Sequence, residues 1–255
     1  MQERGASSRN NKTLSRISKF TAFTKKFNPL PEVEGKRRVA FTLAEVLITL
    51  GIIGVVAALT IPNIIQSYKN QVTVAKLQKA YSVLNQAYQN SVADNGPSEY
   101  WQESDEIGVK EYFNRYWQPY FKGINTCKSK HNYCGYAEQP FFYLNGSEAG
   151  LGVTDSRAFF KTNDDIFFMF TDNTRDSESN LVPWQYIYVD INGSKAPNTF
   201  GKDLFVFERV AGKGILPFGY NLSTNTINSN CRLSSGGTYC ARKIMSEGWK
   251  INYLR

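Results

Sequence analysis

Residues 36–65 read KRRVAFTLAEVLITLGIIGVVAALTIPNII and combine a basic triplet with a long apolar run that begins at Phe41. Residues 46–65 carry no charged side chain. At about 1.5 Å per helical residue, residues 41–65 span roughly 37 Å, which is enough to cross a bilayer core. The basic triplet predicts that the N-terminus stays in the cytoplasm while the rest of the chain is exported. Glu45 lies inside the run, where a carboxylate is costly, so we expect it to have a function.

The helical pattern continues beyond Pro62 through residues 66–95. Apolar side chains recur there in steps of three and four and form one stripe of an amphipathic helix: Val74, Leu77, Tyr81, Leu84 and Tyr88. The sequence Asp-Asn-Gly-Pro at 94–97 is a strong stop signal. We therefore predict one long helix, with a transmembrane or assembly half at 41–65 and an amphipathic half at 66–95.

Residues 96–255 are expected to form an exported globular α+β domain. A short helix is predicted at 107–117 and a helical turn at 241–246. Runs rich in Phe, Tyr, Ile and Val predict strands at 157–161, 165–171, 184–191, 203–210 and 249–253. No helix separates the first four strands, which favours antiparallel pairing. The expected fold is a long N-terminal helix whose apolar stripe packs on one face of an antiparallel sheet.

The positive charge is concentrated at the start of the chain. The formal net charge is +8, but residues 1–40 contain ten Lys or Arg and three Glu, which leaves 20 basic and 19 acidic residues for everything that follows. Residues 1–40 are therefore expected to be a basic cytoplasmic leader without packed structure. Because the remainder is nearly neutral, we expect no nucleic-acid partner for the mature domain.

The spacing within the apolar run is specific. Counted from Phe41, Glu45 is fifth, Gly54 is fourteenth and Pro62 is twenty-second. This pattern resembles the prepilin-type segment of type IV pilins and type II secretion pseudopilins. The resemblance implies that a prepilin peptidase cuts between Ala40 and Phe41 and methylates the new N-terminal amine. Ala40 departs from the family, which usually has Gly there, although Ala is the next smallest residue.

The resemblance also implies a pilin-like fold and a structural function. After cleavage, the α-ammonium of one subunit would neutralise Glu45 of a neighbour, so that two charges that are costly in lipid become a pair that fixes the register between subunits. Small side chains let packed helices approach closely: Gly51, Gly54, Ala57 and Ala58. The expected partners are the peptidase, other pilin or pseudopilin subunits and membrane lipid. The expected location is the bacterial inner membrane, single-pass with the domain outside, and then the pilus or pseudopilus.

The four cysteines form two local pairs. An even number beyond a membrane segment favours disulfides formed in an oxidising compartment: Cys127 with Cys134, and Cys231 with Cys240. His131 lies between the first two, so a zinc site with three ligands is the alternative for that pair. The second pair has no such histidine.

Catalytic signals are sparse. His131 is the only histidine, and no nucleophile elbow, P-loop, zinc-protease or dinucleotide motif is present. We therefore expect no enzyme activity and no cofactor. Weaker similarity to pseudopilin-like proteins extends over residues 190–203. It suggests a calcium site as an alternative to a plain Asn-Gly turn, with oxygen ligands from Asp190, Asn192, Asn198 and Asp203.

Three other functions remain open from the sequence. In an ordinary secreted protein, residues 46–55 would be the apolar core of a signal peptide and residues 56–58 its cleavage site. A signal-anchored binding protein would keep the leader and would not assemble. An exported enzyme is the third, and the shortage of catalytic residues argues against it.

Overall fold

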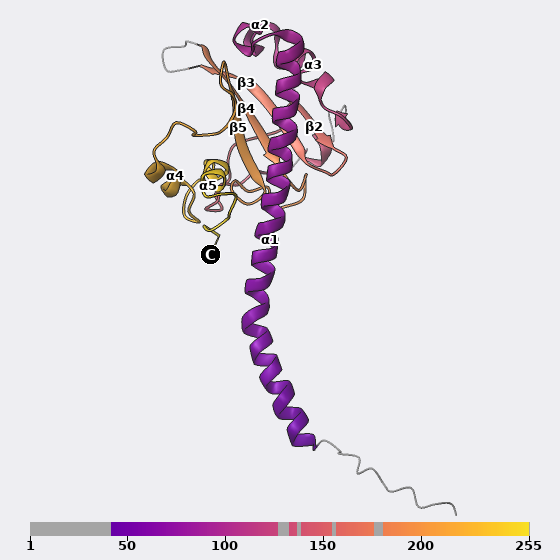
Figure 1. Ribbon diagram of the computed structural model, residues 1–255, viewed down its shortest axis with the longest axis vertical. Coiled ribbons are helices and arrows are strands. Elements are labelled where there is room, and N and C mark those ends of the chain that lie inside the picture. Colours follow the sequence, from indigo (N-terminus) through magenta and orange to yellow (C-terminus); the bar gives the residue numbers. More distant parts are fainter. Residues whose placement is uncertain (1–41, 127–132, 137–138, 155–156, 176–180, 255) are drawn as a thin grey trace, which may run out of the picture. The chain divides into compact units, whose positions relative to one another are not determined.

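The computed structural model describes residues 42–126, 133–136, 139–154, 157–175 and 181–254 (Figure 1). The chain divides into two units, Met1–Gly51 and Ile52–Arg255. The described part of the first unit is a helical segment with its N-terminal cap. The second unit contains the sheet and everything that packs on it.

The longest element is α1 (Leu43–Asn95), which runs without a break through Pro62. It ends at Gly96, whose φ of 81° is readily adopted only by a residue without a side chain. The predicted long helix is therefore confirmed, and it includes most of the apolar run and all of the amphipathic stripe. Within the stripe, Leu77 and Leu84 are completely buried.

All six described strands form one antiparallel sheet. They pair in chain order, so each strand lies beside its predecessor: β1 (Ile124–Thr126), β2 (Ala158–Thr162), β3 (Phe167–Arg175), β4 (Leu181–Asp190), β5 (Leu204–Val210) and β6 (Gly214–Pro217). The four strands predicted between 157 and 210 correspond to β2–β5. The sequence did not predict β1 and β6, which are too short to show a clear alternation.

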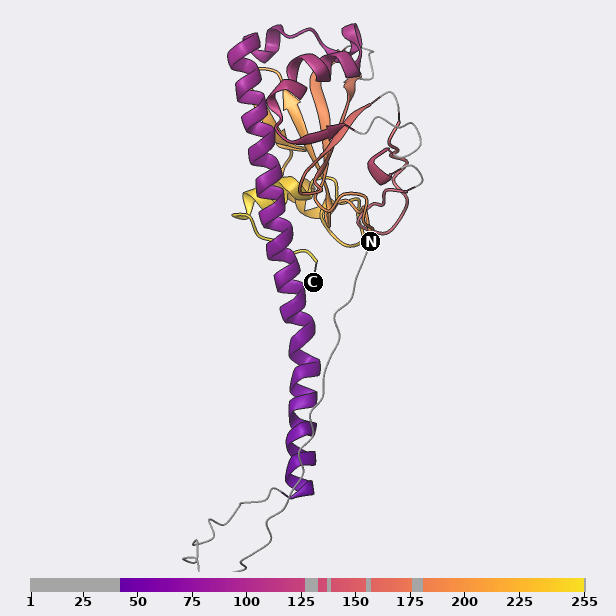
Figure 2. The ribbon, with the colours of Figure 1, turned by 90° about the vertical axis from the view of Figure 1, so that its right-hand side faces the viewer.

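The two faces of the sheet bury different side chains, as the period of two along a strand requires. One face packs against α1 (Figure 2), and it presents Phe160, Phe168, Phe170, Ile187, Val189, Phe205 and Phe207. Tyr81 of α1 stacks on Phe207 with ring centroids 5.3 Å apart. The opposite face buries Phe167, Met169, Leu204 and Val206 beneath Tyr136 and Phe141. The predicted packing of the helix stripe on one face of the sheet is confirmed.

Short helices cover the end of the sheet near the C-terminus of α1. These are α2 (Ser104–Ile107) and α3 (Val109–Tyr116), and α3 confirms the helix predicted at 107–117. An aromatic cluster holds this region together, because Trp101 stacks on Tyr116 with centroids 4.5 Å apart. Trp117 is fully buried between this cluster and Phe170.

The C-terminal region departs from the sequence prediction. α5 (Cys240–Ser246) confirms the predicted helical turn, but residues 249–253 are not a strand. Trp249 has a φ of 60°, which turns the chain sharply after α5, and the segment packs on α1 instead of a sheet edge. α4 (Thr224–Asn230) was not predicted because its residues have low helix propensity. The Ser223 side chain caps it by accepting from Thr226 N–H at 3.2 Å.

Candidate functional site

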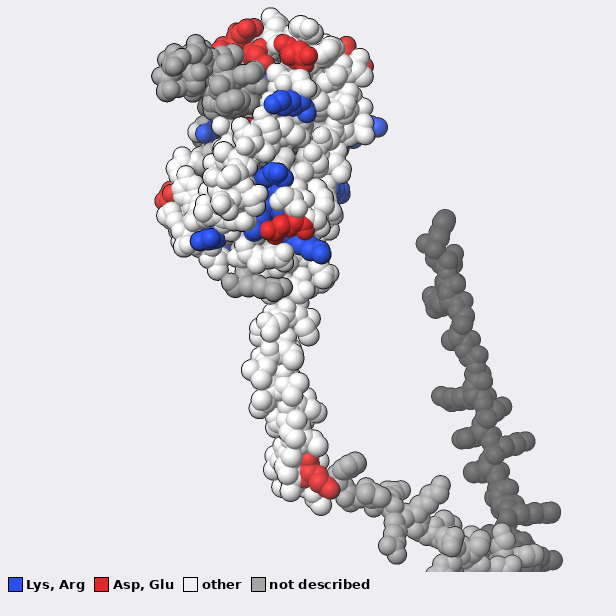
Figure 3. Space-filling model, turned by 60° about the vertical axis from the view of Figure 1, so that its left-hand side comes forward, with Lys and Arg blue, Asp and Glu red and all other residues white. Residues whose placement is uncertain are grey.

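The most unusual surface of the molecule is the apolar part of α1. Among the described residues, α1 is the one helix that is long and apolar enough to cross a membrane. Every described residue from 42 to 65 is exposed except Ala57, which is partly so; Ile53 is 63% exposed and Leu59 is 70% exposed. In Figure 3 the exposed helix is almost entirely free of charged groups. A continuous apolar surface of this size is typical of a segment that contacts lipid or another protein.

Glu45, the only charged residue between 42 and 68, belongs to a capping box at the start of α1. Both the backbone N–H and the hydroxyl of Thr42 donate to Glu45 Oε2 at 2.8 Å. In return, Glu45 N–H donates to Thr42 Oγ1 at 3.2 Å. This reciprocal arrangement satisfies free N–H groups at a helix N-terminus. The Thr-x-x-Glu spacing is present in the sequence, but we did not predict a capping box from it.

Gly54 and Pro62 lie on the same exposed stretch. A Cβ added to Gly54 would meet no described atom within 4 Å, and the same holds for Gly51. Glycine within a helix costs about 0.5–1 kcal/mol relative to alanine, and no contact of the described chain accounts for it here. Ala40 and Phe41, the predicted cleavage and methylation site, lie outside the described residues.

The second predicted disulfide is confirmed. Cys231 and Cys240 are bonded, with Cα atoms 5.3 Å apart, and the bond joins the end of α4 to the start of α5. Cys134 is also a disulfide cysteine, which argues against the zinc alternative because zinc binds thiolates. Cys127 and His131 lie outside the described residues.

The loop after β4 is organised around two buried carboxylates. Asp190 Oδ1 accepts from Asn192 N–H at 3.1 Å. Asp203 accepts from Thr199 N–H at 2.6 Å, from Asn198 N–H at 3.1 Å and from the Asn192 side chain at 3.1 Å. Burial raises the pKa of both carboxyls, and for Asp190 the charge of Asp203 adds to the shift.

These contacts bear directly on the calcium alternative. N–H donors occupy both oxygens of Asp203 and Oδ1 of Asp190, and the Asn192 side-chain nitrogen donates to Lys195 O and Asp203 Oδ2. Within the described part of the chain, no group of three or more His, Cys, Asp or Glu is placed to hold a metal ion. Gly193 has a φ of 65°, and a Cβ there would lie 2.9 Å from Asp165 O. These features describe a hydrogen-bonded loop around an Asn-Gly turn.

Glu208 is a third buried acid, on the sheet face opposite α1. It is 5% exposed and accepts from Gly219 N–H at 3.2 Å. Burial raises its pKa to about 7, and hydrogen bonds from the Gly219 and Tyr220 backbones oppose the shift. The folded protein therefore holds a proton that the unfolded chain releases above its ordinary pKa of 4.5.

We expect Glu208→Gln to reduce the pH dependence of stability. Because the folded-state pKa is raised, the contribution of Glu208 is most favourable below about pH 4.5 and is lost as the pH rises to about 7. In the wild type, Tm should fall across this window, and Asp190 and Asp203 contribute in the same direction. The variant should show a shallower fall and a higher Tm at pH 8 in thermal scans from pH 4 to 8. A slope equal to that of the wild type would contradict this expectation.

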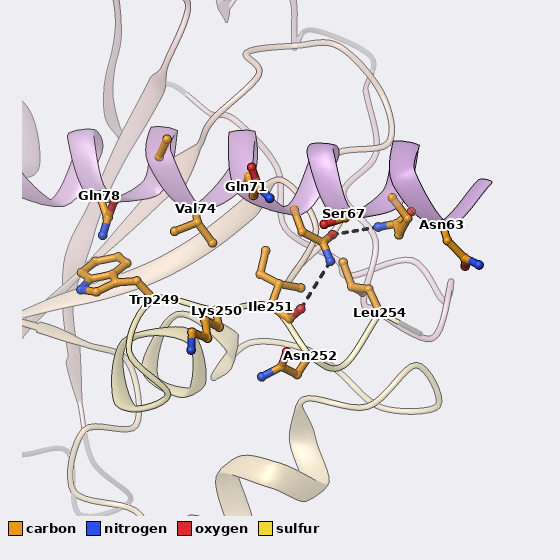
Figure 4. A pocket seen from close by; sticks show the side chains of 13 residues that line it. Asn63, Ser67, Gln71, Val74, Gln78, Trp249, Lys250, Ile251, Asn252 and Leu254 are labelled. Carbon is orange, nitrogen blue, oxygen red and sulfur yellow. Dashed lines mark hydrogen bonds between the residues drawn. The ribbon is translucent and has the colours of Figure 1, made fainter. Parts of the chain in front are cut away.

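A groove of about 830 Å³ lies between α1 and the C-terminal segment. In Figure 4, Val74 and Gln78 of α1 lie across from Trp249 and Ile251. Asn70 Nδ2 donates to Ile251 O at 3.3 Å, and Asn70 Oδ1 accepts from Gln66 Nε2 at 2.8 Å. The groove is lined mainly by amide and apolar side chains, and its lining does not form a recognisable catalytic or metal-binding set.

The comparisons add a family but no function. The model of a family of unknown function (DUF6613) matches residues 63–253. The match begins directly after Pro62, so it includes the amphipathic half of α1 and the sheet but only the last three residues of the apolar run. No curated protein matches the chain, and no solved structure matches it.

Proposed function

The chain belongs to this family of unknown function (DUF6613), and we propose that it is a pilin-like structural subunit of a type IV pilus or a type II secretion pseudopilus. In this proposal a prepilin peptidase removes residues 1–40 and methylates the amine of Phe41. The subunit stays in the inner membrane with its domain outside until its apolar helix packs against other subunits. The mature domain has no enzymatic task and no nucleic-acid partner.

One observation carries the proposal: α1 is a single helix whose second half is domain core and whose first half is exposed and apolar. A signal peptide that is cut off does not need to continue into the core of the domain. If cleavage occurred after residue 58, most of the exposed apolar half of α1 would be lost, and the exported domain would keep residues 59–95, which include the stripe that packs on the sheet. A subunit that assembles through its helix uses both halves, because one holds the domain while the other meets neighbours.

Glu45 supports the same proposal. A carboxylate within an apolar helix that enters lipid is costly unless it has a partner. The capping box supplies neutral partners, whereas cleavage before Phe41 would supply a cation four residues away. Gly54, which has no packing contact in the described chain, is accounted for if another helix approaches it closely.

N-terminal sequencing and intact mass of the mature protein from membranes test this function. An N-methylated Phe41 is the expected result. A mature N-terminus at Leu59 would show an ordinary secreted protein, and an intact Met1 would show an uncut signal anchor. As a control, replacing Ala40 with Lys should block cleavage and leave the full-length chain in the membrane, since the peptidase must fit a small residue there.

A further inference from the structure

A second hollow lies where α1 first meets the domain. It has a volume of about 420 Å³ and is formed by residues 68–76 of α1 together with the loop that follows β4. Its first residue, Tyr68, comes three positions after Ile65, the last residue of the apolar run. At about 1.5 Å per residue, the hollow begins roughly 5 Å beyond that run and extends to roughly 16 Å.

Three lysines line this hollow: Lys69, Lys76 and Lys202. Lys76 donates to Ile191 O at 3.0 Å. None of the three forms an ion pair within the described part of the chain. Other lysines nearby do form such pairs: Lys79 with Asp164 at 2.7 Å, and Lys161 with Asp165 at 2.8 Å.

Asp203 is the acidic side chain that lines the hollow, and in the described part of the chain it forms no ion pair with these lysines. Asp203 is 5% exposed, and N–H groups of Asn198, Thr199 and Asn192 already bind its carboxylate. Asp190 feels the charge of Lys76, but it is fully buried beneath the loop. The hollow therefore presents the exposed Lys69 and Lys202 and the partly buried Lys76, while its acidic side chain is buried and already hydrogen-bonded.

The position of the hollow determines which anion it would meet. The bilayer core is about 30 Å thick, and the headgroup layers extend it to about 40–45 Å. If residues 42–65 cross the core, Tyr68 and Lys69 lie at headgroup level. Tyr68 is 67% exposed, and exposed aromatic residues are typical of membrane interfaces. Basic pockets beside membrane helices bind anionic lipid headgroups.

We propose that this lysine pocket binds the phosphate of an anionic phospholipid in the leaflet on the domain side of the membrane. The inference rests on the membrane insertion in the proposed function, but not on cleavage or assembly. A lipid suits the pocket better than free phosphate does. The membrane presents its headgroups at a high effective concentration, whereas a pocket in which two of the three lysines are exposed holds an isolated ion weakly.

The test is a titration of the full chain in neutral detergent micelles, followed by NMR. The probes are dihexanoyl phosphatidylglycerol, dihexanoyl phosphatidylcholine and inorganic phosphate. The phosphatidylglycerol should bind at least tenfold more tightly than either of the other two. Replacing all three lysines by Gln should weaken it on the order of 100-fold, since each lysine near a membrane surface contributes roughly fivefold. Replacing all three by Arg should preserve it.

A matched variant separates this site from a general charge effect. Lys79, Lys110 and Lys213 lie outside the hollow, and changing them to Gln removes the same net charge; binding should stay within twofold. Equal binding by the Lys69, Lys76 and Lys202 triple variant, or equal affinity for phosphatidylcholine, would overturn the proposal. Equal affinity for inorganic phosphate would assign the pocket to a soluble ion. No binding of any probe would also overturn the proposal.

The result is distinguishable from failure of the proposed function. Carbonate extraction of membranes that contain the full chain tests insertion on its own. A chain that inserts but shows no headgroup preference contradicts only the lipid proposal. A chain that is extracted as a soluble protein contradicts the proposed function.

Discussion

Glu45→Gln is expected to leave membrane insertion and peptidase cleavage intact and to remove the subunit from filaments. The substitution removes the negative charge of Glu45 but keeps the hydrogen bonds with Thr42. Glutamine at the third helical residue can accept from Thr42 as glutamate does, so the start of α1 keeps its capping box. The variant cannot neutralise the α-ammonium of a neighbouring subunit. An unpaired charge buried in this way costs about 3–5 kcal/mol, which lowers the association constant by roughly 10²–10⁴-fold.

Thr42→Ala is the matched control. It removes the hydroxyl that donates to Glu45 at 2.8 Å and accepts from Glu45 N–H at 3.2 Å, but it keeps the carboxylate. Loss of a cap costs about 1 kcal/mol, so incorporation should fall by less than about tenfold. The measurement is quantitative immunoblotting of sheared filaments against total membrane protein. If Glu45→Gln assembled normally while Thr42→Ala did not, capping rather than charge pairing would be the function of Glu45.

The main elements could be predicted because each has a distinct apolar pattern. The stripe on α1 repeats every three or four residues, and Leu77 and Leu84 are fully buried as that repeat requires. The strands β2–β5 are runs rich in Phe, Tyr, Ile and Val, and their two faces contribute to the two cores. The 249–253 segment has the composition of a strand, but composition says nothing about the positive φ of Trp249. Its actual partner, Asn70, is 181 residues away from Ile251.

The candidate sites were harder to predict because they depend on local geometry or distant partners. The number of basic and acidic residues predicts a nearly neutral domain. It does not show that Lys161 forms an ion pair while Lys69 does not. The composition of residues 190–203 is compatible with a cation site, because a sequence does not show which carboxylate oxygens accept hydrogen bonds from backbone N–H groups.

Arg209 shows the same limitation inside the core. It follows Phe205 and Phe207 at the spacing that faces α1, yet it is an arginine, and its side chain is 0% exposed. Its Nη2 lies 2.5 Å from Glu103 Oε2, and the guanidinium lies over the ring of Tyr112, 5.7 Å from its centroid. Within the described residues, its Nε and Nη1 have no hydrogen-bond partner. Glu103, 106 residues earlier in the chain, is therefore the counter-ion of the buried Arg209 guanidinium.

Glu103→Gln should therefore destabilise the folded domain by about 3–5 kcal/mol, because it leaves a buried charge without its counter-ion. The double variant Glu103→Gln with Arg209→Met should recover most of that loss, since an apolar side chain of similar length replaces the unpaired charge. Urea unfolding of the full chain in neutral detergent measures both. Glu106→Gln, an exposed acid on the same segment, is the control and should stay within about 0.5 kcal/mol. A loss below about 1 kcal/mol for Glu103→Gln would show that the guanidinium does not need this carboxylate.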